Sequence, residues 1–123
     1  KAGKRVIVIE PTPSTGLDHG ACALRQLSDR PIPSSAGNCS FRLADTVVVH
    51  SETYAALEQV AAEQGARYVR PRDVLCPNGR CPTHVDGRML YRDTGHLTEF
   101  AARWMAARLN PLGEAGQISS PEI

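Results

Sequence analysis

The chain has 123 residues, of which 14 are lysine or arginine and 13 are aspartate or glutamate, giving a formal net charge of +1. A chain of this length predicts one domain, and a hydrophobic content of 41% is typical of a globular protein. The balanced charge argues against a nucleic-acid-binding surface or a polybasic membrane patch. No apolar run approaches the about 20 residues of a membrane-spanning helix, and the stretch at 6–9 is too short for a signal peptide.

The first third of the chain predicts one strand and one long irregular segment. Residues 4–10 form a continuous run rich in β-branched side chains, which predicts a strand covered on both faces, as in a parallel sheet. Pro11 ends this strand, and the prolines and glycines up to Ser40 predict an irregular connection. His19 falls within that predicted connection.

The middle third predicts a helix followed by a second strand. Ser51 is the predicted N-cap of this helix and Gly65 its predicted end. Residues 47–49 fit either the helix or a preceding extended segment. A short run at 67–70 predicts the second strand, and a strand–helix–strand order favours parallel pairing through a right-handed crossover.

The last third predicts a hairpin and a final helix. Asp86-Gly87 between two short runs is typical of a type I′ hairpin turn. Thr98 is the predicted N-cap of a helix from about Glu99 to Leu109. Phe100 and Trp104 share one face of this helix, so they are interpreted as core residues.

The four cysteines predict two disulfides, Cys22–Cys39 and Cys76–Cys81. The last two flank a Pro-Asn-Gly segment, which reverses the chain and can bring their Cα atoms within bonding reach. Such pairing places the domain outside the reducing cytosol. A four-thiolate zinc site fits the long gap between Cys22 and Cys39 poorly, and unpaired thiols are the third alternative.

Asp93 and His96 lie three positions apart in a predicted turn before the last helix. At this spacing a carboxylate can bond to one imidazole nitrogen and fix the tautomer, while the other nitrogen acts as a general base. A capping histidine or a surface ion pair is the other interpretation. His19, His50 and His84 lack the spacing of a zinc site, so no metal is predicted.

The segment from Asp93 to Thr98 resembles the final block of the SGNH (GDSL-type) hydrolases and acyltransferases. The chain is most similar to one branch, the extracytoplasmic SGNH domain fused behind the integral-membrane domain of bacterial type-three acyltransferases. The motifs that carry this resemblance are the strand at 3–9, the cysteine pair Cys22 and Cys39, Leu75-Cys76-Pro77, Cys81-Pro82, Leu90-Tyr91-Arg92-Asp93 and His96-Leu97-Thr98.

The resemblance implies a three-layer, flavodoxin-like α/β fold with a mostly parallel sheet. Residues 1–109 would be the C-terminal part of such a domain and 110–123 a frayed tail. His96 would be the general base of a Ser–His–Asp triad, and Asp93 would orient it. The family's nucleophile lies in a Gly-Asp-Ser block, which is missing from this sequence. The serines present are interpreted as loop or cap residues (Ser14, Ser34, Ser35, Ser40 and Ser51).

We therefore expect the nucleophile upstream of this chain and no activity from the chain alone. The implied function is transfer of an acyl group, commonly acetyl, to a hydroxyl of a cell-surface glycan, without a cofactor, on the extracytoplasmic side of the membrane. The implied partners are an acyl donor, the glycan, the upstream SGNH half and the integral-membrane domain. A carbohydrate esterase and a non-catalytic, disulfide-stapled secreted binding module are the alternatives. A partial domain would also leave the strand edge at 6–9 unpaired.

Overall fold

The computed structural model describes residues 3–32 and 38–110. Ser34, Ser35 and the predicted tail from residue 111 onward lie outside these ranges. The strands are β1 (Ile7–Ile9), β2 (Phe41–Arg42), β3 (Arg67–Val69), β4 (Arg80–Cys81), β5 (His84–Val85) and β6 (Arg88–Met89). The helices are α1 (His19–Leu27), α2 (Leu43–Gln64), α3 (Arg72–Leu75), the 3₁₀ turn η1 (Pro77–Gly79) and α4 (Glu99–Leu109).

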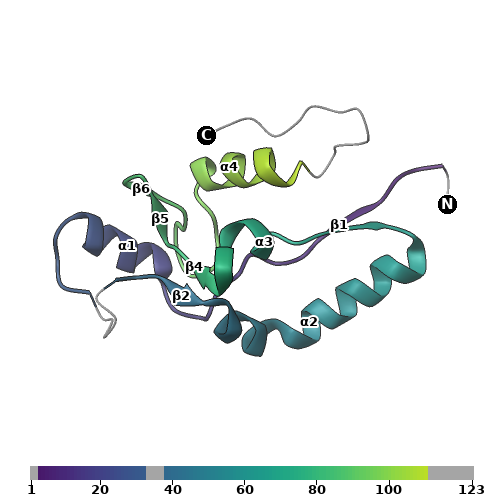
Figure 1. Ribbon diagram of the computed structural model, residues 1–123, viewed down its shortest axis with the longest axis horizontal. Helices are drawn as coiled ribbons and strands as arrows, with labels where there is room; N and C mark the ends of the chain where they lie inside the picture. Colours follow the sequence, from purple (N-terminus) through teal and green to yellow (C-terminus); the bar gives the residue numbers. More distant parts are fainter. Residues whose placement is uncertain (1–2, 33–37, 111–123) are drawn as a thin grey trace.

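A small parallel sheet connects the two ends of the α2 crossover. In it β1 pairs with β3, so that Ile7 lies opposite Arg67 and Ile9 opposite Val69. Figure 1 shows α2 along one side of these strands and α4 on the other. The predicted parallel pairing and the α/β fold class are confirmed. Two short antiparallel pairs, β2–β4 and β5–β6, complete the sheet structure of the described residues.

The start of α2 differs from the prediction. The helix begins at Leu43, so Ser51 is an interior residue and not a cap, and residues 47–49 are helical. Arg42 occupies the N-cap position without a side-chain capping bond, and its guanidinium instead pairs with Asp45 at 2.8 Å. Because valine is a weak helix former and no capping side chain marks the start, propensity alone could not locate this end. Gly65 ends the helix in the left-handed conformation, as predicted.

The segment from Pro11 to Ser40 is not irregular throughout, as the sequence had indicated, because it contains α1. Asp18 caps this helix by accepting a hydrogen bond from the Ala21 N–H at 2.8 Å. His19 is therefore the first residue of a helix and not part of a loop. Aspartate is a favoured N-cap, so Asp18 was the available cue to this helix. His50, expected before a helix cap, lies inside α2.

Both predicted disulfides are present, and all four cysteines are therefore unavailable as zinc ligands or reactive thiols. Cys22–Cys39 joins α1 to the segment that leads into β2. Cys76–Cys81 closes the turn formed by η1, in which Asn78 and Gly79 have φ values of 57° and 78°. These positive values explain the Asn-Gly pair at this turn.

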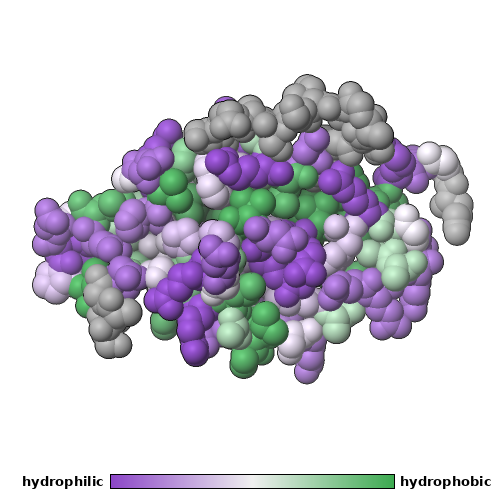
Figure 2. Space-filling view, viewed as in Figure 1, coloured by the Kyte–Doolittle hydropathy of each residue, from purple (hydrophilic) through white to green (hydrophobic). Residues whose placement is uncertain are grey.

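The core gathers side chains from β2, α3, β4, the segment after β6 and α4. Its buried members are Phe41, Leu75, Cys76, Cys81, Leu90, Tyr91 and Ala101, and Phe100 and Trp104 pack against it while partly exposed. In Figure 2 apolar residues gather beneath α4, flanked by hydrophilic ones. None of the helices in the described ranges is long and apolar enough to span a membrane.

The predicted burial of the first strand on both faces is wrong for this chain. Val6 is 57% exposed and Ile9 52% exposed, although both are strongly apolar. Within the described residues β1 pairs only with β3, so its other edge carries no strand. The expectation of an unpaired edge at 6–9 agrees with this arrangement.

Candidate active site

Asp93 and His96 lie on a short loop between β6 and α4, and the neck of this loop is closed by backbone pairing. Tyr91 and Leu97 form an isolated antiparallel bridge. The Arg92 N–H donates to the His96 carbonyl oxygen at 2.7 Å. The two functional candidates are thus held at the tip of a narrow, hydrogen-bonded turn.

Thr98 fixes the loop to the elements on either side of it. Its side chain accepts from the Ala101 N–H at 3.1 Å, which is the predicted N-cap of α4. Its hydroxyl also donates to the Met89 carbonyl oxygen at 2.7 Å, and its backbone N–H donates to the Leu90 carbonyl oxygen at 3.0 Å. The helix start and strand β6 therefore move as one unit with the loop.

The carboxylate of Asp93 organises the turn and the imidazole together. One of its oxygens accepts from the backbone N–H groups of Gly95 at 3.0 Å and His96 at 2.9 Å. These two bonds, with His96's side chain as a further cause, hold the pKa of Asp93 below its ordinary value. Nδ1 of His96 lies 3.0 Å from both carboxylate oxygens.

This geometry leaves the other imidazole nitrogen for chemistry. An ionised Asp93 accepts the proton on Nδ1, so the lone pair resides on Nε2, the nitrogen that a general base uses. Nε2 of His96 makes no hydrogen bond to any described residue, and the His96 side chain is 70% exposed. The predicted contact between Asp93 and His96 is present, and the His96 side chain is accessible.

Helix α1 packs directly against the base of this loop. The Gly20 N–H donates to the Asp93 carbonyl oxygen at 3.3 Å. A Cβ atom at Gly20 would lie 2.5 Å from the carbonyl carbon of Arg92. The fully buried Tyr91 donates its hydroxyl to the Pro13 carbonyl oxygen at 2.7 Å, so the loop after β1 supports the same segment.

His19 has a structural place in this support. Its ring stacks on Phe41 with centroids 4.0 Å apart and meets the edge of Tyr91 at 5.4 Å. Burial lowers the pKa of His19, which favours the neutral imidazole.

A buried polar network at the ends of β1 and β3 escaped the sequence analysis. Glu10 follows β1, has a fully buried side chain, accepts the Tyr68 hydroxyl at 2.7 Å and lies 2.9 Å from Arg72 Nε. The Arg72 guanidinium also covers the Tyr54 ring, 4.4 Å from its centroid. Burial raises the pKa of Glu10. This network fixes the sheet to α2 and α3, and it belongs to the scaffold behind the loop.

No serine among the described residues forms a hydrogen bond with the His96 side chain, which bonds to Asp93. Ser14 is buried in the loop after β1, with its hydroxyl 3.5 Å from Nε2 of His50. The Ser40 hydroxyl donates to the Asn38 side chain, and Ser51 is inside α2. The described ranges also contain no group of three or more metal-ligating side chains.

Comparison with known proteins decides the family. A family model described as an SGNH domain fused to AT3 domains matches residues 1–111. The chain belongs to this SGNH family. Comparison with curated protein sequences gave no significant match.

A solved structure shares the fold of this SGNH domain. It is the periplasmic domain of a lipopolysaccharide acetyltransferase from Salmonella ser. Paratyphi A, with 20% identity and a TM-score of 0.53. The match covers 91% of this chain but 41% of that one, so the SGNH chain spans less than half the length of its structural neighbour. At this level of identity the neighbour shows the shared fold. The two disulfides fit an oxidising compartment.

Proposed function

We propose that this chain is the C-terminal part of an extracytoplasmic O-acyltransferase domain that moves an acyl group, acetyl in the favoured case, to a hydroxyl of a cell-surface glycan. The observation that carries the proposal is the pairing of His96 Nδ1 with both oxygens of Asp93, 3.0 Å each, on an exposed turn. Membership of a family fused to AT3 domains supports it. In the proposed domain residues 1–109 are the SGNH part and 110–123 the tail.

The nucleophile of the proposed triad is a serine upstream of this chain, because the sequence holds no Gly-Asp-Ser block. His96 removes the serine proton through Nε2 as the serine oxygen attacks the acyl carbonyl carbon. The bond to the donor's leaving group then breaks, and His96 returns the proton to that leaving group. In the second half, His96 deprotonates a glycan hydroxyl, whose oxygen displaces the serine, and the serine regains the proton.

The proposed partners follow from this division of the site. The upstream SGNH half supplies the serine and a strand for the open edge of β1, where Val6 and Ile9 are exposed. The integral-membrane acyltransferase domain of the same protein delivers the acyl group and tethers the SGNH domain outside the cytoplasm. A carbohydrate esterase would use the same pair and let water resolve the acyl-serine.

The test is turnover of a small chromogenic acetate by two proteins, this chain and a longer form extended upstream through the nearest Gly-Asp-Ser. Each is compared with its own His96→Ala and Asp93→Asn variants. We expect activity only in the longer form, reduced about 10³- to 10⁴-fold by either substitution. Retained activity in His96→Ala would remove this residue from the mechanism. No turnover in either folded form would favour the non-catalytic binding module.

Transfer and hydrolysis are separated by the product. The longer form is supplied with the chromogenic acetate and a glycan acceptor, and the acetyl group is followed by mass spectrometry. Acetylated glycan supports the transferase, whereas free acetate alone, at a rate independent of the glycan, identifies the esterase.

A further inference from the structure

A second surface feature lies beside the Asp93–His96 turn and is not used by the proposed chemistry. It is an open cleft of about 550 Å³ between β6 and the first turns of α4, lined by Arg88, Glu99, Phe100, Arg103 and Trp104. We call it the α4 cleft. Its volume falls within the range of small-ligand sites.

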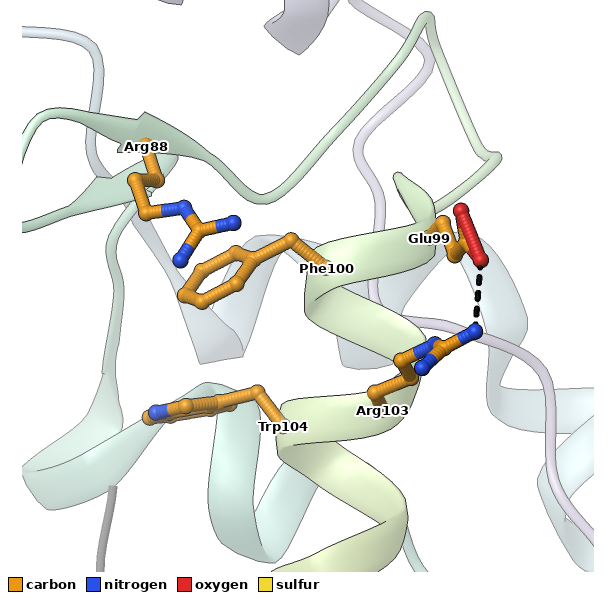
Figure 3. Close-up of a pocket in the computed structure, with 5 residues that line it drawn as sticks. All are labelled: Arg88, Glu99, Phe100, Arg103 and Trp104. Atoms are coloured by element: carbon orange, nitrogen blue, oxygen red, sulfur yellow. Dashed lines mark hydrogen bonds and ion pairs between the residues drawn. The ribbon is translucent and has the colours of Figure 1, made fainter.

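The lining of the α4 cleft combines flat aromatic faces with positive charge. Figure 3 shows the Phe100 and Trp104 side chains leaving α4 in the same direction, with Arg88 reaching over Phe100 from β6. The Arg88 guanidinium lies 4.0 Å from the Phe100 ring centroid. This contact holds the planar guanidinium beside the Phe100 ring. Its N–H groups make no hydrogen bond to another described side chain, so they can bind a ligand.

The charges in the α4 cleft do not cancel. Arg103 is held by Glu99 at 2.9 Å, so this pair contributes little net charge. Arg88 forms no ion pair with a carboxylate in the part of the chain that the structure describes. The five lining residues thus carry one uncompensated positive charge, which lies against the Phe100 ring. The Trp104 ring has the Arg108 guanidinium over it, 4.2 Å from its centroid.

Two features of a ligand match this lining. Aromatic rings bind the C–H-rich face of a sugar ring, and a guanidinium binds a carboxylate or a phosphate through paired N–H groups. We propose that the α4 cleft binds an acidic saccharide, one that carries a uronate or a phosphate group. This lining does not fit a buried helix seam, because three of its five residues are charged.

The position of the cleft connects it with the Asp–His pair. Glu99 follows His96 by three residues, so their Cα atoms are at most about 11 Å apart. Thr98 ties β6 and α4 together, and both walls of the cleft are therefore fixed relative to His96. A saccharide held between Arg88 and Trp104 would present a neighbouring sugar to Nε2. This step rests on the proposed function, while saccharide binding itself does not.

The test is binding, measured without an acyl donor, in the longer form defined above. Trigalacturonic acid is the probe and the uncharged trisaccharide galactotriose its match, and affinity is measured by isothermal titration calorimetry. We expect the acidic trisaccharide to bind more tightly. Arg88→Gln should weaken its binding about tenfold, the loss of one charge-assisted contact, and Trp104→Leu should weaken both trisaccharides.

The controls address folding and general charge. Arg30→Gln removes an exposed arginine outside the cleft and should leave affinity unchanged. Arg88 is itself exposed, so its variant tests the inference even if Trp104→Leu lowers stability. Three results would each overturn the inference: equal affinity for the two trisaccharides, no binding of either, or an Arg88→Gln variant whose affinity for trigalacturonic acid is unchanged. Binding without ester turnover would overturn the proposed function alone. Turnover without binding would overturn this inference alone.

Discussion

The turn that carries Asp93 and His96 depends on Gly20, a glycine outside it. Gly20 lies in α1, where alanine would normally be favoured by about 1 kcal/mol because it restricts the unfolded chain and suits a helix. Here the added Cβ would lie 2.5 Å from Arg92 carbon and 2.8 Å from the Asp93 nitrogen, both backbone atoms. The steric cost therefore exceeds the helical gain.

We predict that Gly20→Ala lowers the free energy of unfolding by about 1–3 kcal/mol, the usual cost of overpacking. In the longer form it should also reduce ester turnover, since it displaces the backbone that carries Asp93. Urea denaturation and the acetate assay measure the two effects. Gly95→Ala, in the same turn but with open space around its Cβ, is the control. A Gly20→Ala protein more stable than the parent would show that α1 does not rest on this segment.

Glu10 gives a pH dependence that can be assigned to one carboxyl group. Burial raises its pKa above the ordinary 4.5, and the hydrogen bond from Tyr68 and the positive charge of Arg72 offset this only in part. A raised pKa means that the folded state binds the proton more tightly than the unfolded state. The resulting stability is complete below pH 4.5 and is lost as pH rises through the folded-state pKa.

Glu10→Gln keeps an oxygen that accepts from Tyr68 but cannot titrate. We predict that the unfolding free energy of the parent, measured relative to this variant, falls as pH rises above 4.5. Urea denaturation at a series of pH values measures it, and Glu52→Gln, on the exposed surface of α2, is the matched control. If the unfolding free energy of the parent relative to Glu10→Gln rose with pH, pairing with Arg72 would outweigh burial.

Element ends that are fixed by nearby residues were predictable from the sequence, whereas ends that are set by tertiary contacts were not. Thr98 caps the start of α4 with its own side chain, and Gly65 ends α2 in the left-handed conformation. The Asp86-Gly87 turn needs two positive φ values, and these residues have φ values of 53° and 76°. The start of α2 follows strand β2, whose partner β4 lies far along the chain, so no local residue marks it.

The candidate site divides in the same way. The Asp93–His96 pair was predictable because both partners lie in one turn. Three other features join residues that are distant in sequence: the Gly20 contact, the Pro13–Tyr91 bond and the α4 cleft. The periodicity of the sequence does not predict such long-range contacts.

The open edge of β1 predicts self-association of this chain. Val6 and Ile9 are exposed, and an unpaired apolar edge is a template for another strand. We predict that Ile9→Lys raises the monomer fraction of the isolated chain, measured by analytical ultracentrifugation. Val48→Lys removes a more exposed apolar residue, 78% exposed, but on helix α2, and should have no such effect. Equal effects of the two substitutions would indicate general solubility and not edge pairing.

At the scale of the whole molecule, the disulfides compensate for a small sheet. Cys22–Cys39 links positions 17 apart, and a loop of that length corresponds to about 3 kcal/mol of stabilisation through the unfolded state. It fixes α1, which in turn supports the Asp93 segment.

We predict that the double variant Cys22→Ala, Cys39→Ala loses about 3 kcal/mol of unfolding free energy in urea denaturation. Reductant should lower the stability of the parent to the level of the double variant or below it, since it opens the second disulfide as well. A parent protein insensitive to reductant, with its thiols shown to be free, would contradict the prediction.

The bond between Tyr91 and Pro13 also constrains the order of folding. Its two ends are 78 positions apart, and contacts between such distant positions form late, because a long loop must close before any contact stabilises it. The turn that carries Asp93 and His96 therefore acquires its support only after most of the chain has been synthesised and has collapsed. A chain that has not yet formed the Tyr91–Pro13 bond lacks this support for the Asp93–His96 turn, which carries the general base in the proposed mechanism.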